Sequence, residues 1–179
     1  MRTACLTVSS SSYPDRAYVA ISRFEEYPNF VNDISSITVR PETSGTAPPN
    51  TMYSDWEVNF RNGPLKWTEV DYHDPVKRQI SFEQHSGDFE VFRGLWRVDA
   101  TDTGSRVGFE VTFDFGIPSL AGVLEPIAER VLKESIYTIL DRILENVALT
   151  ENNLLTSEDQ RAIAAASDDA YFSRRVGVS

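Results

Sequence analysis

Cysteine is almost absent from this sequence, whose 179 residues include Cys5 alone. One cysteine excludes disulfides within the chain and sites built from several thiolates, such as structural zinc sites and iron–sulfur clusters. Histidine is nearly as scarce: His73 and His85 stand alone, without the spacing of metal ligands. The glycines form no phosphate-binding loop. We therefore expect neither a metal nor a cofactor.

Long apolar runs and basic clusters are also missing. No stretch approaches roughly 18 apolar residues, and the first residues lack a secretory hydrophobic run, so we expect a cytoplasmic protein without a membrane span. The 17 basic residues are outnumbered by 27 acidic ones, which gives a net charge of −10. Such a surface repels phosphate backbones, so a nucleic acid partner is not expected.

Apolar and aromatic residues are abundant, at 41% and 11% of the chain, which is enough for the core of one domain. Residues 36–115 read as successive strands, and Asn62-Gly63 between two of them is a strong hairpin signal. The clearest strand, residues 105–115, alternates apolar and polar side chains. Consecutive hairpins predict an antiparallel sheet.

Helical spacing flanks this β region. A first strand over residues 3–9 is followed by a helix starting at Pro14 and one further short turn after Pro28. A long helix is expected from about residue 120 to about 148. The predicted fold is α+β: a curved antiparallel sheet of six or seven strands wrapped around that helix. Residues 1–148 would form the domain, and 149–179 an acidic extension, either a short helix or a mobile tail.

Four phrases, in order, carry a resemblance to a known family: residues 27–31 (YPNFV), 67–69 (WTE), 87–96 (GDFEVFRGLW) and 113–118 (FDFGIP). Together the phrases resemble the START-like or SRPBCC superfamily, with its helix-grip, Bet v 1-like fold. Their best match is the polyketide cyclase/aromatase branch.

The resemblance implies an internal cavity that binds a hydrophobic or aromatic small molecule. The activity it implies is a cofactor-independent polyketide cyclase/dehydratase of antibiotic biosynthesis, supplied by an acyl carrier protein and working as a monomer or homodimer. Two alternatives stay open, because one fold hosts unrelated functions. One is a non-catalytic carrier of a lipid or quinone. The other is a protein-interaction module with a vestigial cavity.

One departure from the family pattern matters. In the aromatase/cyclases that the chain resembles, an arginine held to be catalytic follows a pocket tryptophan by four residues. The matching tryptophan is Trp67, and the matching position is Asp71. A pocket tyrosine of those enzymes is matched by Ile34. The resemblance therefore does not supply the catalytic residues.

The residues themselves suggest three catalytic candidates. Glu69 and Asp71 share a strand face with Trp67, so a cavity on that face would hold two carboxyl groups able to move protons next to a carbonyl. In the alternative, that face is solvated. His85 shares a face with Glu83, which could orient its ring, but Ile80 and Phe82 define the core face of that strand. A bulge near Gly87 would be needed to turn His85 inward.

The candidates for ligand contact are aromatic residues of the sheet and polar or apolar residues beside them. They are Trp56, Trp67, Gln84, Phe92, Trp96, Phe109, Phe113, Ser135 and Ile139. Core packing is the other interpretation of the aromatic residues. His73, beside a turn proline, is expected at the surface.

Overall fold

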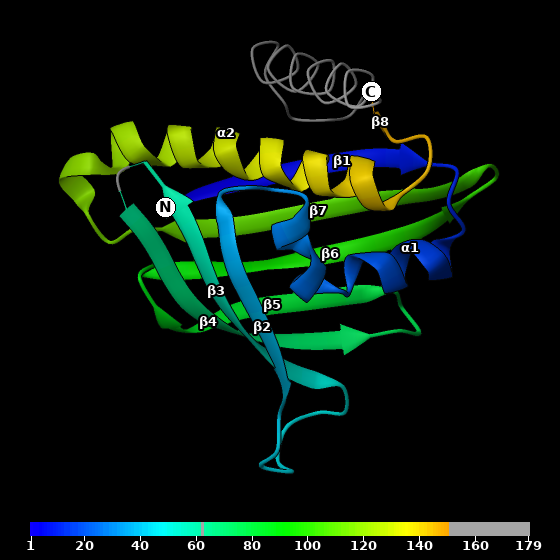
Figure 1. Ribbon diagram of the computed structural model, residues 1–179, viewed down its shortest axis with the longest axis horizontal. Coiled ribbons are helices and arrows are strands. Elements are labelled where there is room, and N and C mark those ends of the chain that lie inside the picture. Colours follow the sequence, from blue (N-terminus) through cyan, green and yellow to red (C-terminus); the bar gives the residue numbers. More distant parts are fainter. Residues whose placement is uncertain (62, 151–179) are drawn as a thin grey trace, which may run out of the picture.

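The structure, a computed structural model, describes residues 1–61 and 63–150. These residues form one antiparallel sheet of eight strands in the order β2-β3-β4-β5-β6-β7-β1-β8, one or two more strands than expected (Figure 1). The strands are β1 (Arg2–Ser10), β2 (Ile34–Pro41), β3 (Thr51–Phe60), β4 (Gly63–Asp74), β5 (Gln79–Gly87), β6 (Val91–Thr101), β7 (Gly104–Asp114) and β8 (Ala148–Leu149). The expected α+β helix-grip fold is confirmed.

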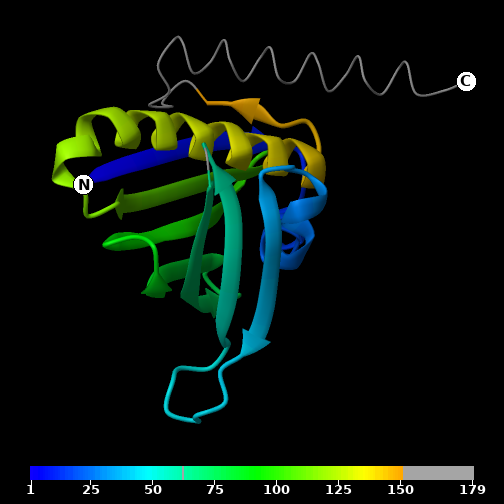
Figure 2. The ribbon, with the colours of Figure 1, turned by 60° about the vertical axis from the view of Figure 1, so that its left-hand side comes forward.

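Three helices accompany the sheet in the described part of the chain. Helix α1 (Pro14–Ile21) and the 3₁₀ helix η1 (Phe24–Asn29) follow β1, as expected, and α2 (Pro118–Ile143) follows β7. The sheet curls, and α2 lies along its open side (Figures 1 and 2). The inward-facing side chains of the strands and those of α2 that face them form one buried core. Alternation in β7 shows the pattern: Val107, Phe109 and Val111 are buried, while Arg106 and Glu110 are exposed.

The long helix ends earlier than expected, at Ile143 instead of about Ala148. Its next residue, Leu144, is extended and buried. The backbone of Glu145 is held by two serines, one at the end of β1 and one just after it. Ser10 Oγ donates to the Glu145 carbonyl at 2.7 Å, and the Glu145 N–H donates to Ser12 Oγ at 2.9 Å. The chain then pairs with β1 as β8. Residues 151–179, where the expected helix or tail falls, lie outside the described residues.

No helix among the described residues is both long and apolar enough to cross a membrane. The same residues contain no group of three or more histidine, cysteine, aspartate or glutamate side chains that could hold a metal ion.

Gly94 on β6 illustrates how tightly the inner face is packed. A Cβ at this position would stand 2.1 Å from the Glu110 carbonyl oxygen and 2.4 Å from the Phe82 ring. The ring of Phe82 lies where any side chain at position 94 would point, because these residues pair across β5 and β6.

We expect Gly94→Ala to lower the free energy of unfolding by about 1–3 kcal/mol, since the core must shift to make room. Gly108→Ala, on the neighbouring strand β7, is the matched control, because a Cβ there meets nothing within 4 Å. Chemical denaturation measures both. Equal effects of the two substitutions would contradict the packing argument.

Candidate functional site

A cavity of about 90 Å³ lies between the curled sheet and α2. Aromatic and aliphatic side chains from η1, six strands and α2 surround it, with Glu69 as the acidic group in its wall. The lining residues are Phe24, Tyr27, Ile34, Trp56, Val58, Trp67, Glu69, Phe82, Phe92, Trp96, Phe109, Val131, Leu132, Ser135, Ile136 and Ile139. The described part of the chain thus encloses a small, mostly apolar chamber of the kind that binds small molecules.

Strand β4 carries the acidic groups. Trp67, Glu69 and Asp71 alternate along it, so all three side chains point to the inner face. Glu69 is 3% exposed and Asp71 is fully buried. The inward interpretation of this face is therefore correct, although Asp71 stands beside the cavity instead of in its wall.

Two tryptophans and a serine hold the acids by hydrogen bonds. Trp67 Nε1 donates to Glu69 Oε1 at 2.6 Å. Ser54 Oγ donates to Asp71 Oδ2 at 2.5 Å and accepts from Trp56 Nε1 at 2.9 Å. The two indole rings stack on each other, 5.5 Å apart and 11° from parallel. Each ring of the stack thus fixes one of the acids.

Burial makes both acids hard to ionise. The pKa of Glu69 is raised well above its ordinary value, first by loss of solvation and then by the neighbouring charge of Asp71. Burial also raises the pKa of Asp71, to about 6, against the opposing hydrogen bonds from Ser54 and Glu69. Both shifts favour a pair that shares a proton over a pair of two carboxylates.

The shared proton also explains an orphaned atom. Asp71 Oδ1 is buried and has no hydrogen-bond partner among the described residues. A protonated Glu69 is a donor toward Asp71, and the two side chains interact in this way. An ionised pair would leave two repelling acceptors away from water, so we infer that the proton between them is part of the folded structure.

Tyr27 and His73 complete the surroundings of the acids. The Tyr27 hydroxyl donates to the Ile21 carbonyl at 2.5 Å, and burial raises its pKa well above 10, so it stays neutral. His73 continues the inner face of β4 beyond Asp71 and packs its ring against Phe24, 5.9 Å away. The expectation that His73 lies at the surface is wrong: it is half-buried, and burial lowers its pKa.

Seven of the expected ligand-contact residues line the cavity: Trp56, Trp67, Phe92, Trp96, Phe109, Ser135 and Ile139. Two others do not. The amide of Gln84 is occupied by the backbone of Phe89, donating to its carbonyl at 2.8 Å and accepting from its N–H at 3.2 Å. Phe113 is fully buried in the core away from the cavity.

His85 is not brought to the cavity. The β4–β5 ladder shifts register between Thr68 and Glu69, which pair with Ser86 and Gln84. His85 is therefore the extra residue of a bulge, as the sequence allowed, yet its side chain stays exposed and lies edge-on against Tyr53, 5.5 Å away. An exposed ring on the outer face cannot exchange protons with a ligand in the chamber.

Sequence reasoning missed Ser54 and Tyr27. The hairpin at residue 63 was a usable signal for Ser54, because it sets the register that places Trp56 opposite Trp67 and Ser54 opposite Glu69. Tyr27 carried no such signal, since its position depends on how η1 docks against the sheet.

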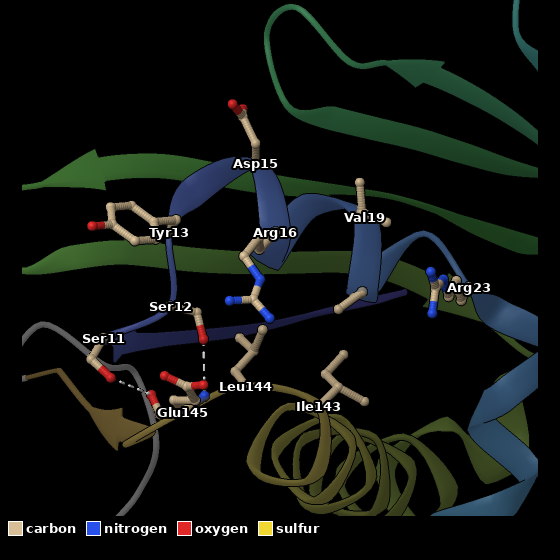
Figure 3. Close-up of a pocket in the computed structure, with 11 residues that line it drawn as sticks. Ser11, Ser12, Tyr13, Asp15, Arg16, Val19, Arg23, Ile143, Leu144 and Glu145 are labelled. Carbon is tan, nitrogen blue, oxygen red and sulfur yellow. Dashed lines mark hydrogen bonds between the residues drawn. The ribbon is translucent and has the colours of Figure 1, made fainter.

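A second hollow, larger in volume, lies between α1 and the end of α2 (Figure 3). It measures about 490 Å³ and includes Arg16, Arg23 and Glu145. Its serines hold the backbone after α2, as described above, and face solvent. Because it contains no buried titratable group, the enclosed chamber is the candidate site.

Residues 13–138 match the family described as polyketide cyclase / dehydrase and lipid transport. The match covers more than half of the chain, so the protein belongs to this family. No curated protein matches the sequence.

Solved structures share the fold at low sequence identity. TTHA0849 from Thermus thermophilus is 19% identical with a TM-score of 0.68, over 79% of this chain and 94% of that one. A START superfamily protein from Mycobacterium smegmatis is 15% identical with a TM-score of 0.66, over 79% and 96%. The Zhui aromatase/cyclase from Streptomyces sp. R1128 is 17% identical with a TM-score of 0.55, over 79% and 86%.

The acid pair makes stability depend on pH in a defined direction. The folded state raises the pKa of Asp71 from 3.8 to about 6, so it binds this proton more tightly than the unfolded chain does. The corresponding stabilisation is complete below pH 4 and is lost as the pH rises through about 6.

Asp71→Asn cannot ionise. We therefore expect its free energy of unfolding, relative to the native protein, to rise between pH 4 and 7 by up to about 3 kcal/mol. Urea denaturation across this range measures the difference. Glu83→Gln, which neutralises an exposed carboxylate on β5, is the control and should show a much flatter difference. A difference between Asp71→Asn and the native protein that stays constant with pH would contradict the raised pKa.

Proposed function

We propose that this protein is a cofactor-independent polyketide cyclase/dehydratase that closes a ring by acid–base catalysis. The observation that supports this is the proton-sharing pair of Glu69 and Asp71 beside an aromatic chamber. Family membership supports the same class, and aromatase/cyclases occur among the proteins of the same fold.

In the proposed reaction, Glu69 is the catalytic residue, because it is the member of the pair in the cavity wall. With the shared proton on Asp71, the Glu69 carboxylate removes a proton from the carbon next to a substrate carbonyl. The enolate attacks a second carbonyl carbon, and Glu69 returns the proton to the alkoxide. In dehydration, Glu69 removes another α-proton and then protonates the departing hydroxyl, which leaves as water.

The surrounding groups assist without touching the reacting atoms. Trp67 fixes the orientation of Glu69 by its hydrogen bond, and Ser54 fixes Asp71, the partner that receives and returns the shared proton. In the aromatase/cyclases that the chain resembles, an arginine is held to be catalytic. In this chain, Asp71 occupies the matching position. Aromatic walls hold flat rings by stacking and edge contacts.

Chamber volume limits the substrate. About 90 Å³ accommodates roughly one six-membered ring, so the proposed substrate is the segment of a polyketone that closes a single ring. Its proposed setting is cytoplasmic antibiotic biosynthesis, with the chain delivered by an acyl carrier protein.

The second candidate is a carrier that binds a hydrophobic molecule without changing it. The mostly apolar wall favours this function, since a carrier needs only a dry, shaped chamber. A carrier predicts binding without proton transfer, so one assay separates the two functions.

Acetophenone tests the proposal, because it has one ring and exchangeable protons next to its carbonyl. In D₂O, the native protein should speed deuterium incorporation at the methyl group, and NMR measures the rate. We expect Glu69→Gln to reduce this acceleration by about 10²-fold or more, since Gln cannot accept the proton. Glu83→Gln should leave the rate unchanged.

Binding is measured alongside the rate by tryptophan fluorescence, so that lost exchange is not mistaken for lost affinity. All three tryptophans of the chain line the cavity, and their emission therefore reports occupancy. Bound acetophenone without accelerated exchange in the native protein would reject the cyclase and support the carrier.

A further inference from the structure

The titratable groups in and beside the chamber wall are acidic. Among the described residues that line it there is no lysine, arginine or histidine, whereas Glu69 stands in the wall with Asp71 against it. The nearest polar groups on other elements are Ser54 on β3 and Tyr27 on η1, and both remain uncharged. Nothing in the wall therefore offsets a negative charge on the acid pair.

Asp71 carries that charge away from water. It is 0% exposed, its Oδ1 has no hydrogen-bond partner among the described residues, and its Oδ2 accepts a hydrogen bond from Ser54. The pair has one proton for two carboxyl groups and hence one net negative charge near neutral pH. In a low-dielectric interior such a charge attracts a cation strongly.

The walls add to the attraction. Trp56 and Trp67 stack at 5.5 Å, and Phe82 and Phe109 stack at 6.0 Å, 14° from parallel. Trp96 lies 4.5 Å from the Phe109 ring. Aromatic faces carry negative charge density, and rings that surround a chamber are the usual partners of ammonium groups.

From the acid pair and these ring faces together, we propose that the chamber binds small aromatic amines in their ammonium form. The ammonium group lies against Glu69, behind which Asp71 is buried, and the ring of the ligand lies among the aromatic walls. This inference concerns binding only, and it holds whether or not the pair catalyses ring closure. It also excludes carboxylates and phosphates as ligands of the chamber, because both would be repelled.

Size and polarity define the ligand further. A volume of about 90 Å³ limits the ligand to one small ring that carries the ammonium group. An inorganic cation would lack enough ligands, since the described residues offer no group of three or more candidate metal-binding side chains. An organic ammonium group needs fewer protein ligands than a metal ion, because the ring attached to it packs against the aromatic walls.

The affinity should depend on pH through Asp71. Below about pH 6 this carboxyl is protonated, the pair is neutral and the attraction is lost. Of the other titratable groups that face the pair, Tyr27 stays neutral, and His73, two residues along β4, has a lowered pKa and is uncharged at pH 7. Ser54 on β3 and Phe82 on β5 do not titrate, so they do not contribute to the pH dependence.

The test compares three probes of one size: benzylamine, benzyl alcohol and benzoate. Calorimetry and tryptophan fluorescence measure their affinities for the full chain from pH 5 to 8. At pH 7.5 we expect benzylamine to bind at least 10-fold more tightly than benzyl alcohol, and benzoate most weakly. Benzylamine should weaken as the pH falls below about 6, while benzyl alcohol should not.

Asp71→Asn should remove the preference for the amine, and Glu83→Gln, which neutralises an outer carboxylate, should keep it. Should the Asp71→Asn variant fail to fold, the pH series on the native protein still decides the matter. Equal affinities for amine and alcohol, or a preference that Glu83→Gln abolishes, would overturn the inference. Either result would leave the deuterium exchange assay of the proposed catalysis unaffected.

Discussion

The proton shared by Glu69 and Asp71 is the interaction on which the site depends. Two carboxylates at this depth would repel each other and lack solvation, and one proton removes both difficulties. The surrounding donors are arranged around that state: Trp67 on Glu69, and Ser54, itself held by Trp56, on Asp71. The acids and the stacked indoles therefore form one unit, in which the polar chemistry and the aromatic wall fix each other.

The unit arises from the pairing of β3 with β4. Their register places Trp56 across from Trp67 and Ser54 across from Glu69. Because side chains alternate along each strand, Ser54, Glu69 and Asp71 all lie on the inner face. Helix α2 covers this face of the curled sheet (Figure 2). A small chamber lies between the helix and the sheet. The fold is shared with proteins of under 20% identity, whereas the acid pair depends on a few positions in one hairpin.

Much of this could be predicted from periodicity. Strand alternation, the Asn-Gly hairpin and the long apolar stripe indicated the antiparallel sheet and its helix, and the shared face of Trp67 and Glu69 indicated the site. What failed depended on contacts that apolar periodicity does not mark. The chain after α2 is held by serines more than 130 residues earlier in the sequence. The amide of Gln84 bonds to the Phe89 backbone, and the bulge at His85 leaves that side chain exposed.

The bulge at His85 also sets how β5 pairs with β4 beside Trp67. One extra residue in β5 changes which side chains face inward, so Gly87 comes to lie directly beneath Trp67. A Cβ at Gly87 would stand 2.4 Å from that of Trp67, and its φ of +143° already disfavours other residues. Trp67 thus packs directly on the backbone of Gly87. A side chain added at this glycine would displace Trp67, and with it the donor of the hydrogen bond to Glu69.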